Sequence, residues 1–264
     1  DSTFKLFYHK LGTKQIEDEL VFDASKNEGD IWFFTNKNKL FLVETNKEET
    51  KRTFYHATID TNNFTLAKLF EDDIYFKFLN YHSGRIYYSS KEYNWGDVKS
   101  FAVSNKDDQK SIIPQLYNNL LMHAYFTEHY IICKYKNSGA NFFNFYNYDG
   151  TFVRKIDVPS GMDVVYDYYD EETRDFYFGV YSYVLPFRNF KINILTGAEQ
   201  PFFSATNRAK ATLFPINYFE TKTISYQSRD NVTIPITIIY KKGVLLDGNN
   251  PTLLKAYGGF GVVS

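Results

Sequence analysis

Two aromatic residues flank a pair of glycines near the end of the chain, in the order Tyr257, Gly258, Gly259, Phe260, and these types could serve a binding or catalytic site. Glycine tolerates positive φ and lets another molecule approach the backbone closely. The motif follows Thr252, Leu253 and Leu254, which we expect to form a strand, and ligands meet an α/β sheet at the carboxyl ends of its strands. A tight strand-to-loop turn packed with aromatic rings explains the same residues, and residue types alone favour that interpretation.

The sequence lacks several motifs that carry known chemistry. It contains no G-x-S-x-G, no H-E-x-x-H, no P-loop and no G-x-G-x-x-G. No histidine has a second His, Cys or carboxylate at the spacing of metal ligands, so we predict no metal site and no cofactor. The histidines are His9, His56, His82, His123 and His129.

Composition excludes further classes of protein. With 30 basic and 31 acidic residues the net charge is -1, and no basic stripe suits nucleic acid. The longest uncharged stretch, residues 111–127, contains polar residues that are costly in a bilayer, so no membrane span is predicted. The single cysteine, Cys133, is expected to be a buried strand thiol, and nothing indicates an oxidising compartment. Because the chain begins at Asp1 without Met or a signal peptide, we expect a fragment or a processed chain.

The aromatic content indicates strands. Aromatic residues make up 19% of the chain, with 23 Tyr and 26 Phe, and such rings favour strands over helices. Short apolar segments bounded by turn residues occur at 39–44, 85–89, 130–134 and 175–180. No long window in the first 210 residues has the apolar periodicity of a helix, so the fold class is mainly all-β.

These segments recur at a nearly constant interval. Apolar strands open at positions 39, 85, 129 and 174, in steps of 46, 44 and 45 residues. A second series, at 8, 55, 101, 145 and 192, advances by 47, 46, 44 and 47 residues. Such a period is typical of propeller blades of four strands. We therefore predict four full blades, the tail of an earlier one, and more blades before Asp1, with an all-β sandwich as the alternative.

The repeat ends near residue 217. Residues 222–228 and 232–240 flank the turn Arg229-Asp230-Asn231, whose residue types tolerate positive φ, so a hairpin is predicted. Pro235 lacks a donor for the sheet and is expected at an edge or a bulge. We predict two regions, residues 1–217 as a partial propeller and 218–264 as the start of another domain.

Two separated segments resemble the prolyl oligopeptidase family. Residues 8–18, YHKLGTKQIED, are similar to a segment of its propeller, and residues 233–260, with IPITIIYKKG, DG, P and YGGF in order, resemble the start of its hydrolase domain. Residues 182–197 are similar to its last blade. The resemblance covers nearly the whole chain and implies a seven-bladed propeller over an α/β-hydrolase domain, of which residues 218–264 are the first strands.

The resemblance also implies an activity: a serine peptidase, monomeric at full length, that cuts short proline-containing peptides after proline while the propeller gates access. Tyr257 would donate its hydroxyl to the oxyanion, Phe260 would line the proline pocket, and Gly258 and Gly259 would let substrate approach. The Ser, Asp and His triad would follow Ser264, so the chain alone would be inactive. A cytoplasmic location is expected, with a periplasmic or secreted one open because the amino terminus is missing.

Departures from the family pattern leave alternatives open. Lys255, Ala256 and Gly261 differ from the residues that the family usually has there, which affects the expected pocket shape. One alternative is a related oligopeptidase that prefers basic residues, although Phe260 favours proline. The other is a non-catalytic homologue whose propeller binds peptides or partners.

Overall fold

The computed structural model describes residues 4–25, 30–48, 50–59, 65–73, 76–90, 94–137, 140–159, 161–184, 187–201 and 218–256. This part of the chain is built from strands, and its helical structure is one 3-10 turn, η1 (Gln15–Glu17). The predicted mainly all-β fold class is therefore confirmed.

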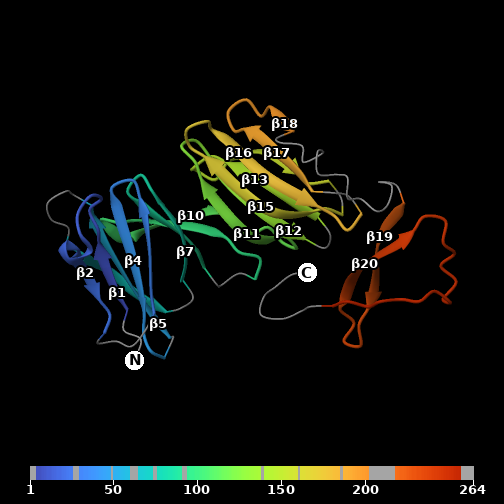
Figure 1. Ribbon diagram of the computed structural model, residues 1–264, viewed down its shortest axis with the longest axis horizontal. Coiled ribbons are helices and arrows are strands. Elements are labelled where there is room, and N and C mark those ends of the chain that lie inside the picture. The colour runs from blue at the N-terminus through green and yellow to red at the C-terminus, as the bar shows by residue number, and fades with distance from the viewer. Residues whose placement is uncertain are drawn as a thin grey trace. The chain divides into compact units, whose positions relative to one another are not determined.

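Four sheets of four antiparallel strands follow one another within the described residues, and we number them blades 1 to 4 (Figure 1). In every blade the spatial order of the strands is their order in the sequence. The recurrence read from the sequence is thus confirmed as four consecutive blades. Blade 1 comprises β3 (Ile31–Asn36), β4 (Lys39–Thr45), β5 (Lys51–Thr58) and β6 (Ala67–Asp73); blade 2 comprises β7 (Phe76–His82), β8 (Arg85–Ser90), β9 (Val98–Ala102) and β10 (Asn105–Ile113). Blade 3 comprises β11 (Leu120–Phe126), β12 (Ile131–Asn137), β13 (Ala140–Tyr146) and β14 (Phe152–Asp157); blade 4 comprises β15 (Asp163–Asp170), β16 (Asp175–Tyr181), β17 (Arg188–Asn193) and β18 (Glu199–Pro201).

Apolar faces join blades 1, 2 and 3, which lie in one compact unit. Between blades 1 and 2, the stacked rings of Phe54 and Phe70 meet Phe101, whose ring centroid lies 5.2 Å from that of Phe70. Between blades 2 and 3, a second cluster joins Val98 and Ile113 to Ile131. Because each blade has apolar residues on both faces, it needs a neighbour on each side, which explains the aromatic-rich composition.

Two shorter pairs of strands flank the blades in sequence. The strands β1 (Lys5–Tyr8) and β2 (Glu19–Asp23) form a two-stranded antiparallel sheet, and their assignment to the tail of an earlier blade stays a prediction. The strands β19 (Phe219–Gln227) and β20 (Thr233–Lys241) form the predicted hairpin, in which Asn231 has φ 63°. Pro235 lies in β20, and each strand of this pair has an open edge in the described residues, as predicted.

One predicted element is wrong. Residues 251–256 have no regular secondary structure, although we expected a strand at 252–254. Leu253 is 93% exposed and Leu254 is 80% exposed. A strand of this apolar kind is stable only when neighbouring strands pair with its backbone and cover its faces, and no described strand does so. The domain boundary at 217 stays a prediction, because residues 202–217 lie outside the described part; blade 4 and the hairpin β19–β20 fall in the second compact unit.

Candidate functional site

The first strands of neighbouring blades meet, β3 with β7 and β7 with β11. The Asn36 side-chain amide in β3 donates to the Asn80 Oδ1 at 3.2 Å and to the Tyr81 carbonyl at 2.9 Å, both in β7. The rings of Phe34 and Phe78 lie 4.4 Å apart. The backbones of β7 and β11 also approach within 8 Å, Cα to Cα. Blades that converge at their first strands have the geometry of a propeller, whose first strands face its channel. We call β3, β7 and β11 the first-strand surface.

A β-bulge recurs on the first strands. The pairing register shifts at Leu79 in β7, at Met122 in β11 and at Val165 in β15. Each of these positions lies 43 residues after the one before it. A bulge turns its side chain away from the regular alternation. Sequence reasoning missed this feature, because Leu, Met and Val are ordinary strand residues and the bulge depends on the partner strand.

Titratable side chains lie on or next to these strands. Desolvation, followed by the charges of Lys77 and Lys134, lowers the pKa of His123 in β11. Desolvation and the charge of Lys37 lower the pKa of His82, whose ring stacks on Tyr148 at 4.2 Å. In blade 4, burial raises the pKa of Asp167 in β15 to about 6.

Asp97 is a buried carboxylate that organises the connection between β8 and β9. Asp97 is only 2% exposed to solvent. It accepts bonds from the Ser90 N–H at 2.8 Å, the Ser90 hydroxyl at 2.9 Å and the Ser89 hydroxyl at 3.2 Å. The Lys99 ammonium lies 3.8 Å away. These contacts satisfy the charge internally, so Asp97 serves the fold and is not available to a substrate.

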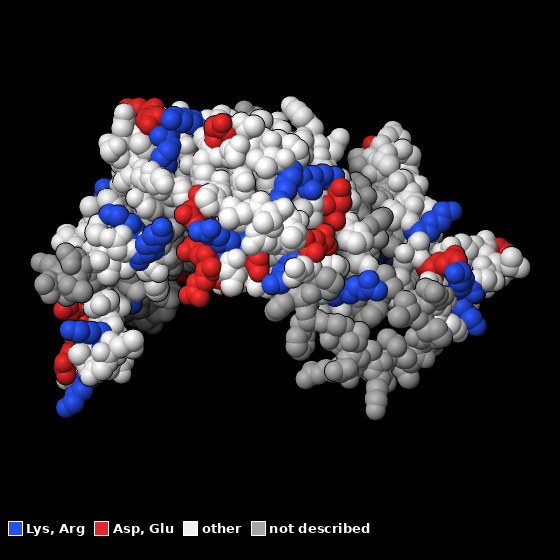
Figure 2. Space-filling view, turned by 90° about the horizontal axis from the view of Figure 1, so that it is seen from above, with Lys and Arg blue, Asp and Glu red and all other residues white. Residues whose placement is uncertain are grey.

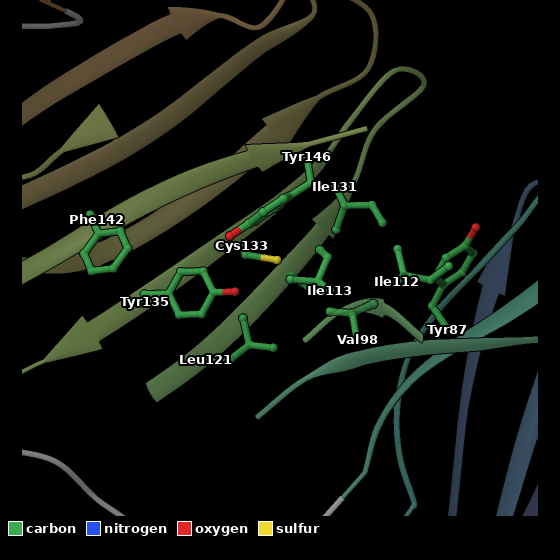
Figure 3. Close-up of a cluster of buried hydrophobic side chains, with 11 residues drawn as sticks. Tyr87, Val98, Ile112, Ile113, Leu121, Ile131, Cys133, Tyr135, Phe142 and Tyr146 are labelled. Atoms are coloured by element: carbon green, nitrogen blue, oxygen red, sulfur yellow. The ribbon is translucent and has the colours of Figure 1, made fainter. Parts of the chain in front are cut away.

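Cys133 lies in the core between blades 2 and 3, as predicted. Figure 3 shows Cys133 in one buried cluster with Tyr135 and Tyr146. Burial, which outweighs a hydrogen bond from Tyr135, raises the pKa of Cys133 to about 12. A thiol held in its neutral form is a poor nucleophile, so this position is structural.

The site residues predicted from the sequence, Tyr257, Gly258, Gly259 and Phe260, lie outside the described residues. The described chain leads toward them through residues 242–256, which are mostly exposed. One turn in this segment is fixed by Asn250, whose side-chain amide donates to the Leu245 carbonyl at 2.7 Å.

The remaining features of the described residues are a paired histidine, the absence of a metal cluster and mixed surface charge. His9 Nδ1 lies 2.6 Å from Asp18 Oδ1, a pair that closes the loop between β1 and β2 and that sequence spacing did not reveal. Across the described part, no three His, Cys, Asp or Glu side chains gather closely enough to hold a metal ion. None of the described helical structure is long and apolar enough to cross a membrane. On the face shown in Figure 2, side chains of both charges are interspersed.

The consecutive four-stranded blades define a β-propeller protein. The family model described as "Prolyl oligopeptidase, N-terminal beta-propeller domain" matches residues 1–204. The chain therefore belongs to the prolyl oligopeptidase family of peptidases, as the sequence resemblance predicted.

Curated relatives match almost the whole chain. Prolyl endopeptidase of Elizabethkingia meningoseptica is 26% identical over 277 residues, which cover 98% of this chain and 36% of that protein. Prolyl endopeptidase of Dictyostelium discoideum is 24% identical over 290 residues, with 98% and 37% covered. The chain thus spans little more than a third of the length of these relatives.

Solved structures support the same fold. Prolyl oligopeptidase B from Galerina marginata, in its apo form, matches with a TM-score of 0.75 at 18% identity, over 93% of this chain and 36% of that one. A mutant of the same enzyme, bound to a 25mer macrocyclization substrate, matches with a TM-score of 0.76 at 18% identity, over 92% of this chain and 35% of that one.

Proposed function

We propose that this chain is the central part of a serine peptidase that hydrolyses short peptides on the carboxyl side of proline. The observation that carries the proposal is the family match over residues 1–204, together with the ordered motifs at 233–260 that resemble the start of the hydrolase domain. Relatives described as prolyl endopeptidases cover 98% of the chain. In this proposal the Ser, Asp and His triad is encoded after Ser264.

Two residues of the chain take part in the proposed chemistry. The Tyr257 hydroxyl donates a hydrogen bond to the carbonyl oxygen as it becomes negatively charged in the tetrahedral intermediate, a type of interaction worth about 10² to 10³ in rate. The Phe260 ring packs against the substrate proline, which rewards a flat apolar ring over a charged or flexible side chain. Gly258 and Gly259 leave space for the substrate backbone.

In this proposal the propeller selects substrates by limiting which molecules reach the active site. Blades that converge at β3, β7 and β11 line a passage toward the hydrolase domain, and a passage of this kind admits extended chains and excludes folded proteins. The contact between Asn36 and Asn80 supports this role, because a passage selects by size only if its blades stay joined.

Cleavage of matched peptides tests the proposal. The full-length protein is assayed with three chromogenic peptides that differ only in Pro, Ala or Arg at the cleaved position. The proposal expects the largest kcat/KM for Pro and covalent labelling of one serine by a fluorophosphonate. A preference for Arg would support the related oligopeptidase of basic specificity.

A non-catalytic propeller homologue is the second candidate. The sequence that follows Ser264 distinguishes this candidate from the peptidase, because the proposed catalysis needs a G-x-S-x-G motif with Asp and His farther along the chain. We further propose a cytoplasmic, monomeric protein. Cell fractionation and sedimentation of the full-length protein test these two points.

A further inference from the structure

In the described part of the chain, no strand pairs with the outer edge of β3, although the side chains of Phe34 and Asn36 contact β7. The strand β3 is the first in the order β3-β4-β5-β6, and six consecutive residues pair with β4 without a shift, from Ile31 opposite Glu44 to Asn36 opposite Lys39. A straight edge strand displays a regular row of backbone donors and acceptors.

The hydrogen-bond pattern shows which residues display these groups. The Thr45 N–H donates to the Asp30 carbonyl at 2.8 Å, so this pair is hydrogen-bonded. Antiparallel strands alternate between bonded and non-bonded pairs, so the even-numbered residues of β3 bond to β4 and the odd-numbered residues face away. In the described part of the chain these outward groups have no backbone partner. The outward-facing residues are Ile31, Phe33 and Thr35.

The first strands of the other blades differ from β3. The bulges at Leu79, Met122 and Val165 interrupt the regular row in β7, β11 and β15. Bulges on edge strands prevent the addition of another strand, because they interrupt the regular row of backbone groups with which the added strand would pair. Among the first strands of the four described blades, β3 alone keeps the regular register.

The side chains beside this edge suit a peptide. Trp32 and Phe33 point to opposite faces of β3 and are 52% and 49% exposed, so each can cover one face of an added strand. β3 itself has no charged side chain, but exposed Asp30 and Lys37 stand at its two ends. A short peptide running parallel to β3 places its free amino end beside Asp30 and its free carboxylate beside Lys37. These eight positions span about 25 Å.

We propose that the open edge of β3 binds an extended oligopeptide as an additional, parallel strand of blade 1. The inference rests on the proposed function, which makes oligopeptides the natural ligands of the protein. Backbone hydrogen bonds give affinity for many sequences, and the rings of Trp32 and Phe33 favour proline. A proline is accommodated where its nitrogen faces away from β3.

N-methylated peptides test the backbone contacts without changing the protein. The probe is a ten-residue peptide with free termini, in which Thr and Val alternate around one Pro, with fluorescein on a Lys side chain. Binding to the full-length protein, inhibited with a fluorophosphonate, is followed by anisotropy. A peptide with four N-methyl groups on alternate residues keeps all N–H groups on one of its two edges, so its Kd should change less than threefold. A peptide with four N-methyl groups on consecutive residues loses N–H groups on both edges, so its binding should weaken at least tenfold.

Substitution of Thr35 tests the position. Its N–H faces the open edge, so Thr35→Pro removes one donor without breaking the bonds to β4. The matched control is Thr35→Val, which keeps the N–H and the branched shape. One net hydrogen bond corresponds to a loss of about three- to tenfold in affinity for Thr35→Pro relative to Thr35→Val. Circular dichroism of both variants checks the fold.

The outcomes separate this inference from the proposed function. Equal binding of the two methylated peptides, or equal affinity of the two Thr35 variants, overturns the inference, while cleavage of the Pro peptide by the uninhibited enzyme still supports the proposed function. If the Pro peptide is not cleaved but consecutive methylation weakens binding as expected, the result supports peptide binding at β3 and overturns the proposed peptidase function. A dimer that Thr35→Pro dissociates means that a second copy occupies β3, and also overturns the inference.

Discussion

Gly150 lies where blade 3 touches blade 2, and replacing it tests how tightly the blades fit. It belongs to the turn between β13 and β14, has φ +88°, and bonds through its N–H to the Asn147 carbonyl at 2.9 Å. A Cβ built at this position would lie 2.0 Å from the carbonyl oxygen of Ile112 in β10. Since Ile112 is packed in the cluster between the blades, its backbone cannot move away without disturbing that cluster.

Two effects add in Gly150→Ala. A non-glycine residue in the left-handed region costs about 1 to 2 kcal/mol. Forcing an extra carbon into a packed contact costs roughly 1 to 3 kcal/mol more, so the free energy of unfolding should fall by about 2 to 5 kcal/mol. Gly84 is the matched control, because it has φ +79° with nothing within 4 Å of its Cβ position. Gly84→Ala should show the first effect alone.

Urea unfolding measures the difference. Trp32 and Trp95 belong to blades 1 and 2, so tryptophan fluorescence of the chain reports on the part of the fold where the contact lies. We expect a clearly lower midpoint for Gly150→Ala than for Gly84→Ala at a similar slope. Coincident unfolding curves for the two variants would refute the reasoning, because the contact between blades would then have no energetic consequence.

Four further outcomes are expected. Tyr257→Phe in the full-length protein should lower kcat on a proline peptide by about 10² to 10³ with little change in KM, and an unchanged kcat removes Tyr257 from catalysis. Phe260→Ala should reduce the preference for Pro over Ala by about 1 to 3 kcal/mol; an equal loss on both peptides means that Phe260 does not select proline. With its pKa raised to about 12, Cys133 should react with iodoacetamide at least about a hundredfold more slowly in the folded than in the denatured chain, and equal rates contradict its burial. The pKa of His82 is lowered below its unfolded value, so the unfolded state takes up the proton first and stability falls as the pH drops below about 6.5. His82→Gln should therefore lose less stability than wild type between about pH 7 and pH 5, and parallel losses would show that His82 is not responsible.

The blades were predictable because their signal is repeated and local. The strands that open at Lys39 and Arg85 begin at the predicted residues, and those expected at 129 and 174 begin one or two residues later, at Ile131 and Asp175. Turn chemistry was equally readable, since the turn at Asn231 adopts the positive φ that its type tolerates. These features depend on neighbours in sequence, which a sequence displays directly.

Features that depend on partners in space were not predictable. The bulge at Met122 exists only relative to β12, and the contact of His9 with Asp18 closes a loop whose shape the residue types do not specify. Thr252, Leu253 and Leu254 resembled a strand, but such a segment forms one only beside strands that pair with it. The interpretation of Tyr257 and Phe260 comes from family resemblance, because periodicity and spacing assign no chemistry to them.

The simple strand order of the blades has a consequence for biosynthesis. Every strand in blades 1 to 4 pairs with the strand next to it in the sequence, so each sheet closes through short loops of chain. A stretch of about 45 residues leaves the ribosome in roughly 2 to 9 s, whereas a hairpin forms in about 1 to 10 μs. Each blade can therefore pair its strands before the next blade has been synthesised. The aromatic face of each blade stays exposed to solvent during that interval. The nascent chain therefore exposes one apolar surface after another, and each is covered only when the next blade has folded against it.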